Sequence, residues 1–370
     1  MSTAFLGGLI FIVVFAGSIL VHELGHFLTA RLLGIQVDEF GIGFPPRLVK
    51  LFRWKETDFS LNWIPLGGFN RLHGEDDPSV PGGMAAARPW KRIVVLLGGA
   101  AMNLLTAVFA ISLLIGQTGI PDKVIIKDVS PDTPASQAGI LPGDVVIQAG
   151  GRTIHAYSEL QTYTSAHLGQ TITLTIQRGS QTLPVSLVPR KNPPAGQGAM
   201  GVLIESDPAK AYRPVRSWFE TVPLSFQATG EAIGELLSLP GRIIAGTIPA
   251  SDAQLAGPRS IWNLFQQAVT RDVQSRETTP TTTSQPVEPT NYTLVVIINL
   301  TISLAVINLL PIPALDGGRI FMTLPELLLR RPIPARYQAM INGIGFILLV
   351  TLLGFFYIKD LINPLAINLP

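Results

Sequence analysis

Two histidines and a glutamate near the start of the chain have the spacing of a metal site. Residues 22–26 read His-Glu-Leu-Gly-His, an H-E-x-x-H pattern. On a helix, His22 and His26 share one face at i and i+4, so both imidazoles can reach one metal ion. Glu23 lies beside them and can act as general base for a metal-bound water. The motif ends an apolar helix, where ionisable side chains are costly and usually functional. This context favours a metal site over two histidines that are merely hydrogen-bonded at a helix end.

A catalytic zinc generally has three protein ligands and one open position for water, so a third ligand must come from elsewhere in the chain. The remaining histidines lie in expected loops or β-rich segments: His73, His155 and His167. Asp316 is better placed, because Pro311 and Pro313 interrupt an apolar helix before it and Gly317-Gly318 permit a tight turn. Irregular backbone at membrane depth is tolerated only where protein buries it or it lines a water-filled cavity. Asp316 is therefore the strongest candidate, with a carboxylate that only caps the helix as the alternative.

The composition is that of a membrane protein rather than a soluble one. Hydrophobic residues make up 47% of the 370 residues and charged residues only 14%, against about 25% charged in typical globular proteins. The mean hydropathy is +0.38. These values exclude a disordered chain and argue against a wholly soluble one. The net charge of +2 is too small to indicate a nucleic-acid partner. The lack of cysteine excludes disulfides, thiolate nucleophiles and cysteine-ligated metals.

Four segments can cross a membrane. A spanning helix needs about 20 mainly apolar residues. Four segments of this length lack Asp, Glu, Lys, Arg and His: Ser2–Val21, Ile93–Ile115, Tyr292–Leu315 and Tyr337–Ile358. The first is interpreted as a retained span and not a signal peptide, because no basic residue precedes its apolar core and its helical pattern continues toward Leu33.

The basic residues predict the orientation of these helices. They are concentrated in the loops between the first and second spans and between the third and fourth spans: Arg31, Arg47, Lys50, Arg53, Lys55, Arg71, Arg88, Lys91, Arg92, Arg319, Arg330, Arg331 and Arg336. The tail before the first span has none, and the tail after the fourth has only Lys359. Because short basic loops stay in the cytoplasm, both termini and the stretch from Gln117 to Asn291 are predicted to lie on the outer side.

The segments between the spans differ in character. Three short, aromatic-rich strand patterns in the first loop favour a β-hairpin region at the membrane interface: Gln36–Phe40, Leu48–Trp54 and Asp58–Ile64. Beyond the second span, β-branched runs alternate with turn signals, as in a small, mostly β domain. A Thr- and Pro-rich stretch before the third span is typical of a flexible linker.

The predicted architecture is a polytopic α-helical membrane protein with about four transmembrane helices, a membrane-associated β-hairpin region and one outer β domain. Its segments are the first transmembrane helix with the H-E-x-x-H motif, 1–33; the cytoplasmic loop with membrane-associated strands, 34–91; the second helix, 92–116; the β domain, 117–193; a partly helical outer region, 194–270; the linker, 271–290; the third transmembrane segment, 291–318; a cytoplasmic loop, 319–336; and the fourth helix, 337–358.

Together these motifs resemble the site-2 protease family of intramembrane zinc metalloproteases, in particular its bacterial RseP-type (regulator of sigma-E protease) branch. The resemblance covers nearly the whole chain. It rests on HELGH in the first span, GIGFPPRL and PLGGF in the loop, GAAMN in the second span, a PDZ-like outer domain and NLLPIPALDGG in the third span. H-E-x-x-H alone is moderately specific, but its pairing with N-x-x-P-x-P-x-L-D-G in a later span is very specific.

The resemblance implies a zinc-dependent endopeptidase that hydrolyses peptide bonds in or near the transmembrane segments of other proteins. His22, His26 and Asp316 would bind Zn²⁺, Glu23 would be the catalytic base, and Asn308 would contact the substrate backbone. It also implies a multi-pass protein of the bacterial inner membrane with its zinc toward the cytoplasmic side, in agreement with the basic loops. Expected substrates are single-span membrane proteins such as anti-sigma factors, or remnant signal peptides.

The outer domain and the second span refine this resemblance. The runs Ser130–Ala135 and Ala138–Asp144 are similar to those of PDZ domains in bacterial envelope proteases. Such a domain would bind a peptide C-terminus or exclude substrates that carry a bulky outer domain.

The second span reads Gly99-Ala100-Ala101-Met102-Asn103, without the proline of the family pattern. The role of Asn103 therefore stays open between a site residue and a helix-packing contact.

Two other protein classes compete with the protease. One is a non-proteolytic, PDZ-bearing membrane scaffold with a structural metal site, against which the intact Glu23 argues. The other is a transporter built on broken helices. Transporters tend to have paired half-helices in two repeats, whereas this sequence has one such break, at Pro311–Pro313. The partners expected for the protease are its membrane protein substrates and the lipid bilayer, with no nucleic acid.

Overall fold

The computed structural model describes residues 3–75, 77–194, 197–205, 211–246, 257–277, 291–329 and 334–363. The chain divides into two compact units. The first comprises Met1–Ser112, Val222–Glu277 and Asn291–Pro370, and the second comprises Leu113–Thr221 and Thr278–Thr290. The two units are described separately below.

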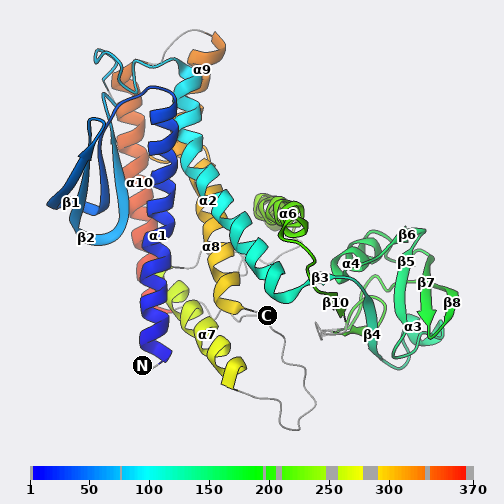
Figure 1. Ribbon diagram of the computed structural model, residues 1–370. Helices are drawn as coiled ribbons and strands as arrows, with labels where there is room; N and C mark the ends of the chain where they lie inside the picture. Colours follow the sequence, from blue (N-terminus) through cyan, green and yellow to red (C-terminus); the bar gives the residue numbers. More distant parts are fainter. Residues whose placement is uncertain are drawn as a thin grey trace. The chain divides into compact units, whose positions relative to one another are not determined.

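In the described part of the chain, four helices are long and apolar enough to cross a membrane: α1 (Thr3–Leu32), α2 (Pro89–Thr118), α8 (Tyr292–Leu309) and α10 (Ala335–Ile362) (Figure 1). They match the four predicted spans, with one difference in the third. The predicted span runs to Leu315, whereas α8 ends at Leu309. Proline cannot donate the helical N–H and its ring clashes with the preceding turn, so Pro311 and Pro313 end the helix early.

The short loop predicted after the third span is instead mostly helical. α9 (Asp316–Leu329) begins at the predicted third metal ligand. Residues 319–329, predicted as cytoplasmic loop, continue this helix, while residues 330–333 lie outside the described part of the chain. The apolar residues of α9 recur at helical spacing, and Met322 is buried. α9 is also joined to α2 by an ion pair between Glu326 and Arg92 at 2.7 Å.

A further helix, α7 (Pro258–Glu277), ties the long helices together. Its Phe265 is buried and packs edge-on against Phe11 of α1, with ring centroids 5.7 Å apart. Asp360 of α10 accepts the backbone N–H groups of Arg259 and Ser260. Near the C-terminal end of α7, Asp272 accepts the N–H groups of the first residues of α8, Tyr292 and Thr293, at 2.8 and 2.9 Å. These bonds satisfy helix N-termini that would otherwise lack partners.

This contact corrects the predicted linker at its start. The linker was expected from Arg271, but α7 continues to Glu277, because Asp272 is held by the start of α8. The rest of the predicted linker, residues 278–290, lies outside the described residues.

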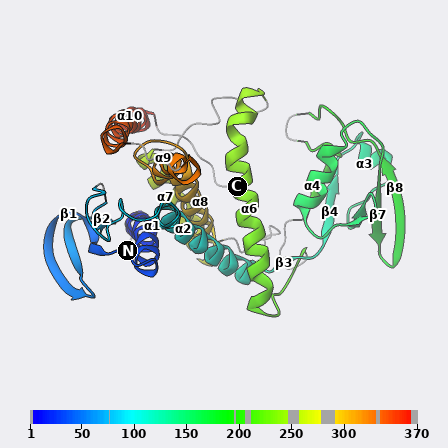
Figure 2. The ribbon, with the colours of Figure 1, turned by 90° about the horizontal axis from the view of Figure 1, so that it is seen from above.

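The first loop forms a long hairpin of β1 (Val37–Trp54) and β2 (Thr57–Leu72). Its turn residues Lys55 and Glu56 both have positive φ, 43° and 71°, as the two-residue turns that match strand twist require. The prediction ended the strands at Ile64, whereas β2 continues through Gly67 and Gly68 to Leu72. Figures 1 and 2 both show the hairpin beside α1.

The hairpin folds back on itself. Residues 39–42 form the middle of three paired segments, with 58–61 on one side and 68–71 on the other. The outermost segment, 68–71, lies against α1. A Cβ on Gly68 would be 2.8 Å from a methyl carbon of Leu20, and Asn70 donates to the backbone oxygen of Glu23 at 3.3 Å. The edge of the sheet is therefore held next to the H-E-x-x-H motif.

The second unit contains the small β domain. Its main sheet has the strand order β8-β7-β5-β4-β9, with β6 paired to β5. The strands are β4 (Val124–Val129), β5 (Val145–Ala149), β6 (Arg152–Thr153), β7 (Ile172–Arg178), β8 (Gln181–Leu187) and β9 (Val202–Ile204). Among its described residues are the helices α3 (Pro134–Gln137) and α4 (Tyr157–Ala166). The prediction ended the domain at residue 193, but β9 completes its sheet, because Val202 pairs with Val129.

Alternating apolar side chains of the strands fill one core, with Ile126, Val146 and Leu174 fully buried. Asp144 is buried beside this core and accepts two bonds from Arg178, both at 2.7 Å, and one from the N–H of Leu141 at 2.8 Å. Burial alone would raise the pKa of Asp144, but these bonds outweigh it and hold the pKa below its usual value. The Pro-Gly-Asp turn is thus fixed by a charged pair.

The remaining elements connect the domain to the helices. β3 (Ile120–Pro121) pairs with β10 (Tyr212–Arg213) in a separate two-stranded sheet. α6 (Trp218–Ile244) follows and contains Pro223 and Pro240. Its start carries exposed aromatic side chains, Trp218 and Phe219. The described residues of the partly helical outer region predicted at 194–270 include β9, β10, α6 and the start of α7.

Candidate metal centre

His22 and His26 lie on one face of α1, as the i, i+4 spacing predicts. Each side chain is buried, with 7% of the residue exposed. Their rings meet edge to face with centroids 4.7 Å apart, and the two Nε2 atoms are 3.1 Å apart. Both histidines therefore present the same ring nitrogen to the same point.

α2 runs close to this point because glycines replace side chains where the two helices cross. A Cβ on Gly98 would lie 2.7 Å from the carbonyl oxygen of Gly25, so the helices touch backbone to backbone. A Cβ on Gly99 would lie 2.5 Å from Nε2 of His26 and 2.7 Å from Nε2 of His22. Small residues allow such close helix approach in membranes. Gly99 leaves the space in which the two ring nitrogens converge.

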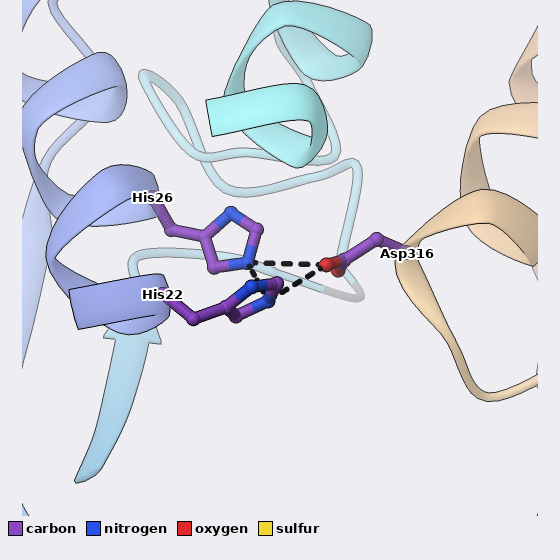
Figure 3. Close-up of side chains that lie close together, drawn as sticks. All are labelled: His22, His26 and Asp316. Atoms are coloured by element: carbon purple, nitrogen blue, oxygen red, sulfur yellow. Dashed lines mark hydrogen bonds and ion pairs between the residues drawn. The ribbon is translucent and has the colours of Figure 1, made fainter. Parts of the chain in front are cut away.

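Asp316 reaches the histidines from the opposite end of the sequence (Figure 3). Its Oδ2 lies 3.0 Å from Nε2 of His22 and 3.3 Å from Nε2 of His26. Between α8 and α9 the chain turns sharply, with Ala314 at a φ of 76°, a conformation that is unfavourable for residues with a Cβ. Gly318 packs against the backbone of Ile312 and Pro313. The predicted prolines lie at this break, but the predicted glycine turn is wrong: the sharp turn is at Ala314, and Gly317 and Gly318 belong to the first turn of α9.

The three side chains fit a zinc ion by their chemistry and spacing. One nitrogen of each histidine and one carboxylate oxygen all lie within 4.8 Å of one another. Two histidines and a carboxylate are a common ligand set of catalytic zinc, which keeps a further position open for water. Nδ1 of His26 bonds the carbonyl oxygen of Val95 at 2.8 Å. Such a bond fixes the ring and leaves its Nε2 lone pair free for a metal.

Glu23 is half-buried on the turn of α1 between the two histidines. Its carboxylate interacts electrostatically with His26, His22 and Asp316. Its backbone oxygen accepts the bond from Asn70 of β2, which holds the sheet edge to this turn. The arrangement places a carboxylate base next to the candidate ligands.

None of the other predicted residues takes part in the bonds that join the cluster of three. Asn308 lies half-buried in the last turn of α8 and makes none of the bonds that join His22, His26 and Asp316. The remaining histidines have partners of their own. His73 pairs with Asp38 at 3.0 Å, His167 bonds the backbone oxygen of Tyr163 at 2.8 Å, and His155 precedes α4 in the β domain.

Two contributions of α2 were not predicted in full: sequence reasoning missed Gly99 and left the role of Asn103 open. Gly99 makes room for the histidine rings, and the side chain of Asn103 lies 3.4 Å from Nδ1 of His22. The run of small residues in the second span was a signal of close helix packing. It did not show which helix would be the partner.

The comparisons with known proteins identify the chain as a zinc metalloprotease. The chain belongs to Peptidase family M50, the site-2 protease family, whose model matches residues 10–352. A relative from Clostridium perfringens, named as a zinc metalloprotease, is 33% identical over 361 residues, which cover 96% of this chain and 98% of the relative. A relative of the same description from Nostoc is 31% identical over 371 residues, covering 94% of each chain.

Two solved structures that are similar to part of this chain are PDZ domains. One is the PDZ domain of an SdrC-like protein from Listeria monocytogenes, with 20% identity and a TM-score of 0.21, covering 23% of this chain and 90% of that one. Another is the PDZ domain of an SdrC-like protein from Listeria innocua, with 26% identity and a TM-score of 0.20, covering 23% of this chain and 94% of that one.

Proposed function

We propose that this zinc metalloprotease hydrolyses peptide bonds in or near the transmembrane segments of other membrane proteins. One observation carries the proposal: His22, Glu23 and His26 lie within an apolar helix, Phe5–Leu32, that is long enough to span a membrane. Asp316 follows directly on the break after α8, another such helix. A substrate bond would therefore have to reach the site at membrane depth.

His22, His26 and Asp316 would hold the zinc, and Glu23 would act as the general base and then as the general acid. Zinc supplies Lewis acidity that lowers the pKa of a water to about 7 and polarises the scissile carbonyl. Glu23 takes a proton from the attacking water and delivers it to the leaving amine. The burial of the histidines keeps bulk water from their ring nitrogens.

The substrate must be extended before it can be cut. A helix hides its carbonyl groups in its own hydrogen bonds, which are hard to give up in lipid. The edge segment 68–71 of β2 lies next to Glu23, and in the described part of the chain no further strand pairs with it. An unwound substrate could add to this edge as a strand, with Asn308 bonding its freed backbone.

We expect cleavage to depend on how easily the substrate helix unwinds. The zinc-loaded protein in liposomes would be given a single-span protein with an all-leucine core and a second with two central glycines. Glycine costs a helix about 1 kcal/mol per residue, so two glycines should make the second substrate about 30 times faster to cut. A zinc chelator should stop both reactions. A zinc-loaded protein that cuts neither would favour a non-proteolytic scaffold.

The β domain offers a second contact for the substrate. A groove of about 530 Å³ lies between the start of α4 and β9, lined by Tyr157, Ser158, Val202 and Ile204 among others. β9 is an edge strand, to which an extended peptide could pair. In the cleavage assay, a substrate ending in a free carboxylate outside the membrane would be compared with its C-terminal amide. Faster cleavage of the free acid supports peptide capture, and equal rates favour exclusion of bulky substrates.

We place the protein in the inner membrane of a bacterium, with both basic loops in the cytoplasm and the β domain outside. The support is the concentration of Arg and Lys in those loops. The lack of cysteine allows a direct test. An impermeant maleimide should label a Gln181→Cys variant, in β8, only from the outer side, and a Ser79→Cys variant only from the cytoplasmic side. Both residues are exposed, and the reverse pattern would refute this orientation.

A further inference from the structure

The two candidate histidine ligands differ in the partner of Nδ1, the ring nitrogen that faces away from the candidate metal position. A histidine that binds a metal through Nε2 carries a proton on Nδ1, and that N–H needs an acceptor which fixes the ring. Nδ1 of His26 has one, the carbonyl oxygen of Val95 at 2.8 Å. Nδ1 of His22 faces the side-chain amide of Asn103 at 3.4 Å.

Asn103 has no visible task other than this contact. It is 1% exposed, in the middle of the apolar helix α2. Its Nδ2 is the atom that faces His22, while its buried Oδ1 has no hydrogen-bond partner. A buried polar atom left without a partner is costly, about 1–3 kcal/mol. An amide at this position of a lipid-spanning helix therefore calls for an explanation.

The role of His22 as a metal ligand would explain why an amide is buried here. With a metal on Nε2, Nδ1 of His22 is a donor, and the NH₂ of Asn103 cannot accept its proton. A half-turn of the amide exchanges its two ends within the same volume and brings Oδ1 to Nδ1. The oxygen then gains a partner and the histidine gains its acceptor.

We infer that Asn103 is the positioning residue of His22: its Oδ1 accepts the Nδ1–H and aims Nε2 at the metal. This inference rests on the metal-ligand roles proposed for His22, His26 and Asp316. Val95, Gly99 and Asn103 are spaced four residues apart and so share one face of α2. Along that face, Val95 holds His26, Gly99 leaves room for both rings, and Asn103 holds His22.

The test compares three variants by zinc affinity, measured with a competing chelator at one pH. Asn103→Leu keeps the size of the side chain but has no acceptor, and we expect zinc to bind about 10–100-fold more weakly. Asn103→Asp keeps an acceptor oxygen and should bind zinc at least as tightly as wild type. Thr106→Val is the matched control, because Thr106 bonds only the backbone of its own helix at Met102, and its zinc affinity should be unchanged.

The visible absorption of the Co²⁺-substituted proteins adds a readout of ligand geometry. Asn103→Leu should alter the spectrum, whereas Asn103→Asp and Thr106→Val should not. Wild-type affinity and spectrum in folded Asn103→Leu would overturn the inference, as would equal weakening in Asn103→Leu and Asn103→Asp. If Asn103→Leu does not fold, Asn103→Asp decides: retained affinity supports the acceptor role, and a loss overturns it. Neither readout uses a substrate, so a failure of the proposed proteolysis would be seen separately.

Discussion

Glu23→Gln should abolish cleavage while the protein keeps its zinc. The amide has the size of the carboxylate but cannot take a proton from water. Loss of a general base typically lowers the rate by about 10²–10⁴-fold. The metal should stay, because the three atoms that converge belong to His22, His26 and Asp316. Zinc content by atomic absorption and cleavage of a single-span substrate, measured on the same preparation, check both halves of this result.

The control for this variant is Glu235→Gln, the same change at an exposed position of α6. It should leave both zinc content and cleavage at the wild-type level. Cleavage by Glu23→Gln within a few-fold of wild type would remove Glu23 from the role of base. Loss of zinc together with cleavage would mean that Glu23 supports the metal rather than the proton transfer.

Gly99→Ala should weaken zinc binding strongly by adding a single methyl group. Its Cβ would lie 2.5 Å from Nε2 of His26 and 2.7 Å from Nε2 of His22, the atoms expected to hold the zinc. The helices cannot move apart easily, because Gly98 already contacts the carbonyl of Gly25. Overpacking of this kind costs about 1–3 kcal/mol, so zinc affinity should fall about 10- to 100-fold, with cleavage lost in parallel.

Gly17→Ala is the matched control. Gly17 also lies in a long apolar helix, but nothing lies within 4 Å of the position its Cβ would take. We expect unchanged zinc affinity and a melting temperature that is equal or higher, because alanine favours helix more than glycine does. Zinc affinity in Gly99→Ala equal to that in Gly17→Ala would show that the two helices separate more readily than their backbone contact indicates.

The sequence predicted the parts of this fold that depend on local pattern. The length of the apolar segments predicts the four spanning helices. The H-E-x-x-H spacing predicts that the two histidine side chains lie on one face of α1. Pro311 and Pro313 gave the break before Asp316. The structure brings these three candidate ligands together, and their role in binding zinc stays a prediction that the variants above test.

Features that depend on tertiary contact could not be predicted in the same way. The strand β9 joins the β domain because it pairs with β4, which lies far from it in the sequence. The first turns of the expected linker are helical because Asp272 caps α8. The proposed role of Asn103 depends on which histidine ring of α1 packs against it, and this is set by how α1 and α2 cross. Periodicity and turn residues carry no information on such distances.

The ligand set has a consequence for the synthesis of the protein, because its members lie at opposite ends of the gene. His22 and His26 enter the membrane with the first helix, whereas Asp316 is made 294 residues after His22. A chain still on the ribosome, with only its first two helices inserted, holds two of the three ligands and should retain zinc poorly. If the proposed specificity and ligand roles hold, the protease would therefore be unable to cut neighbouring nascent helices until Asp316 has been made.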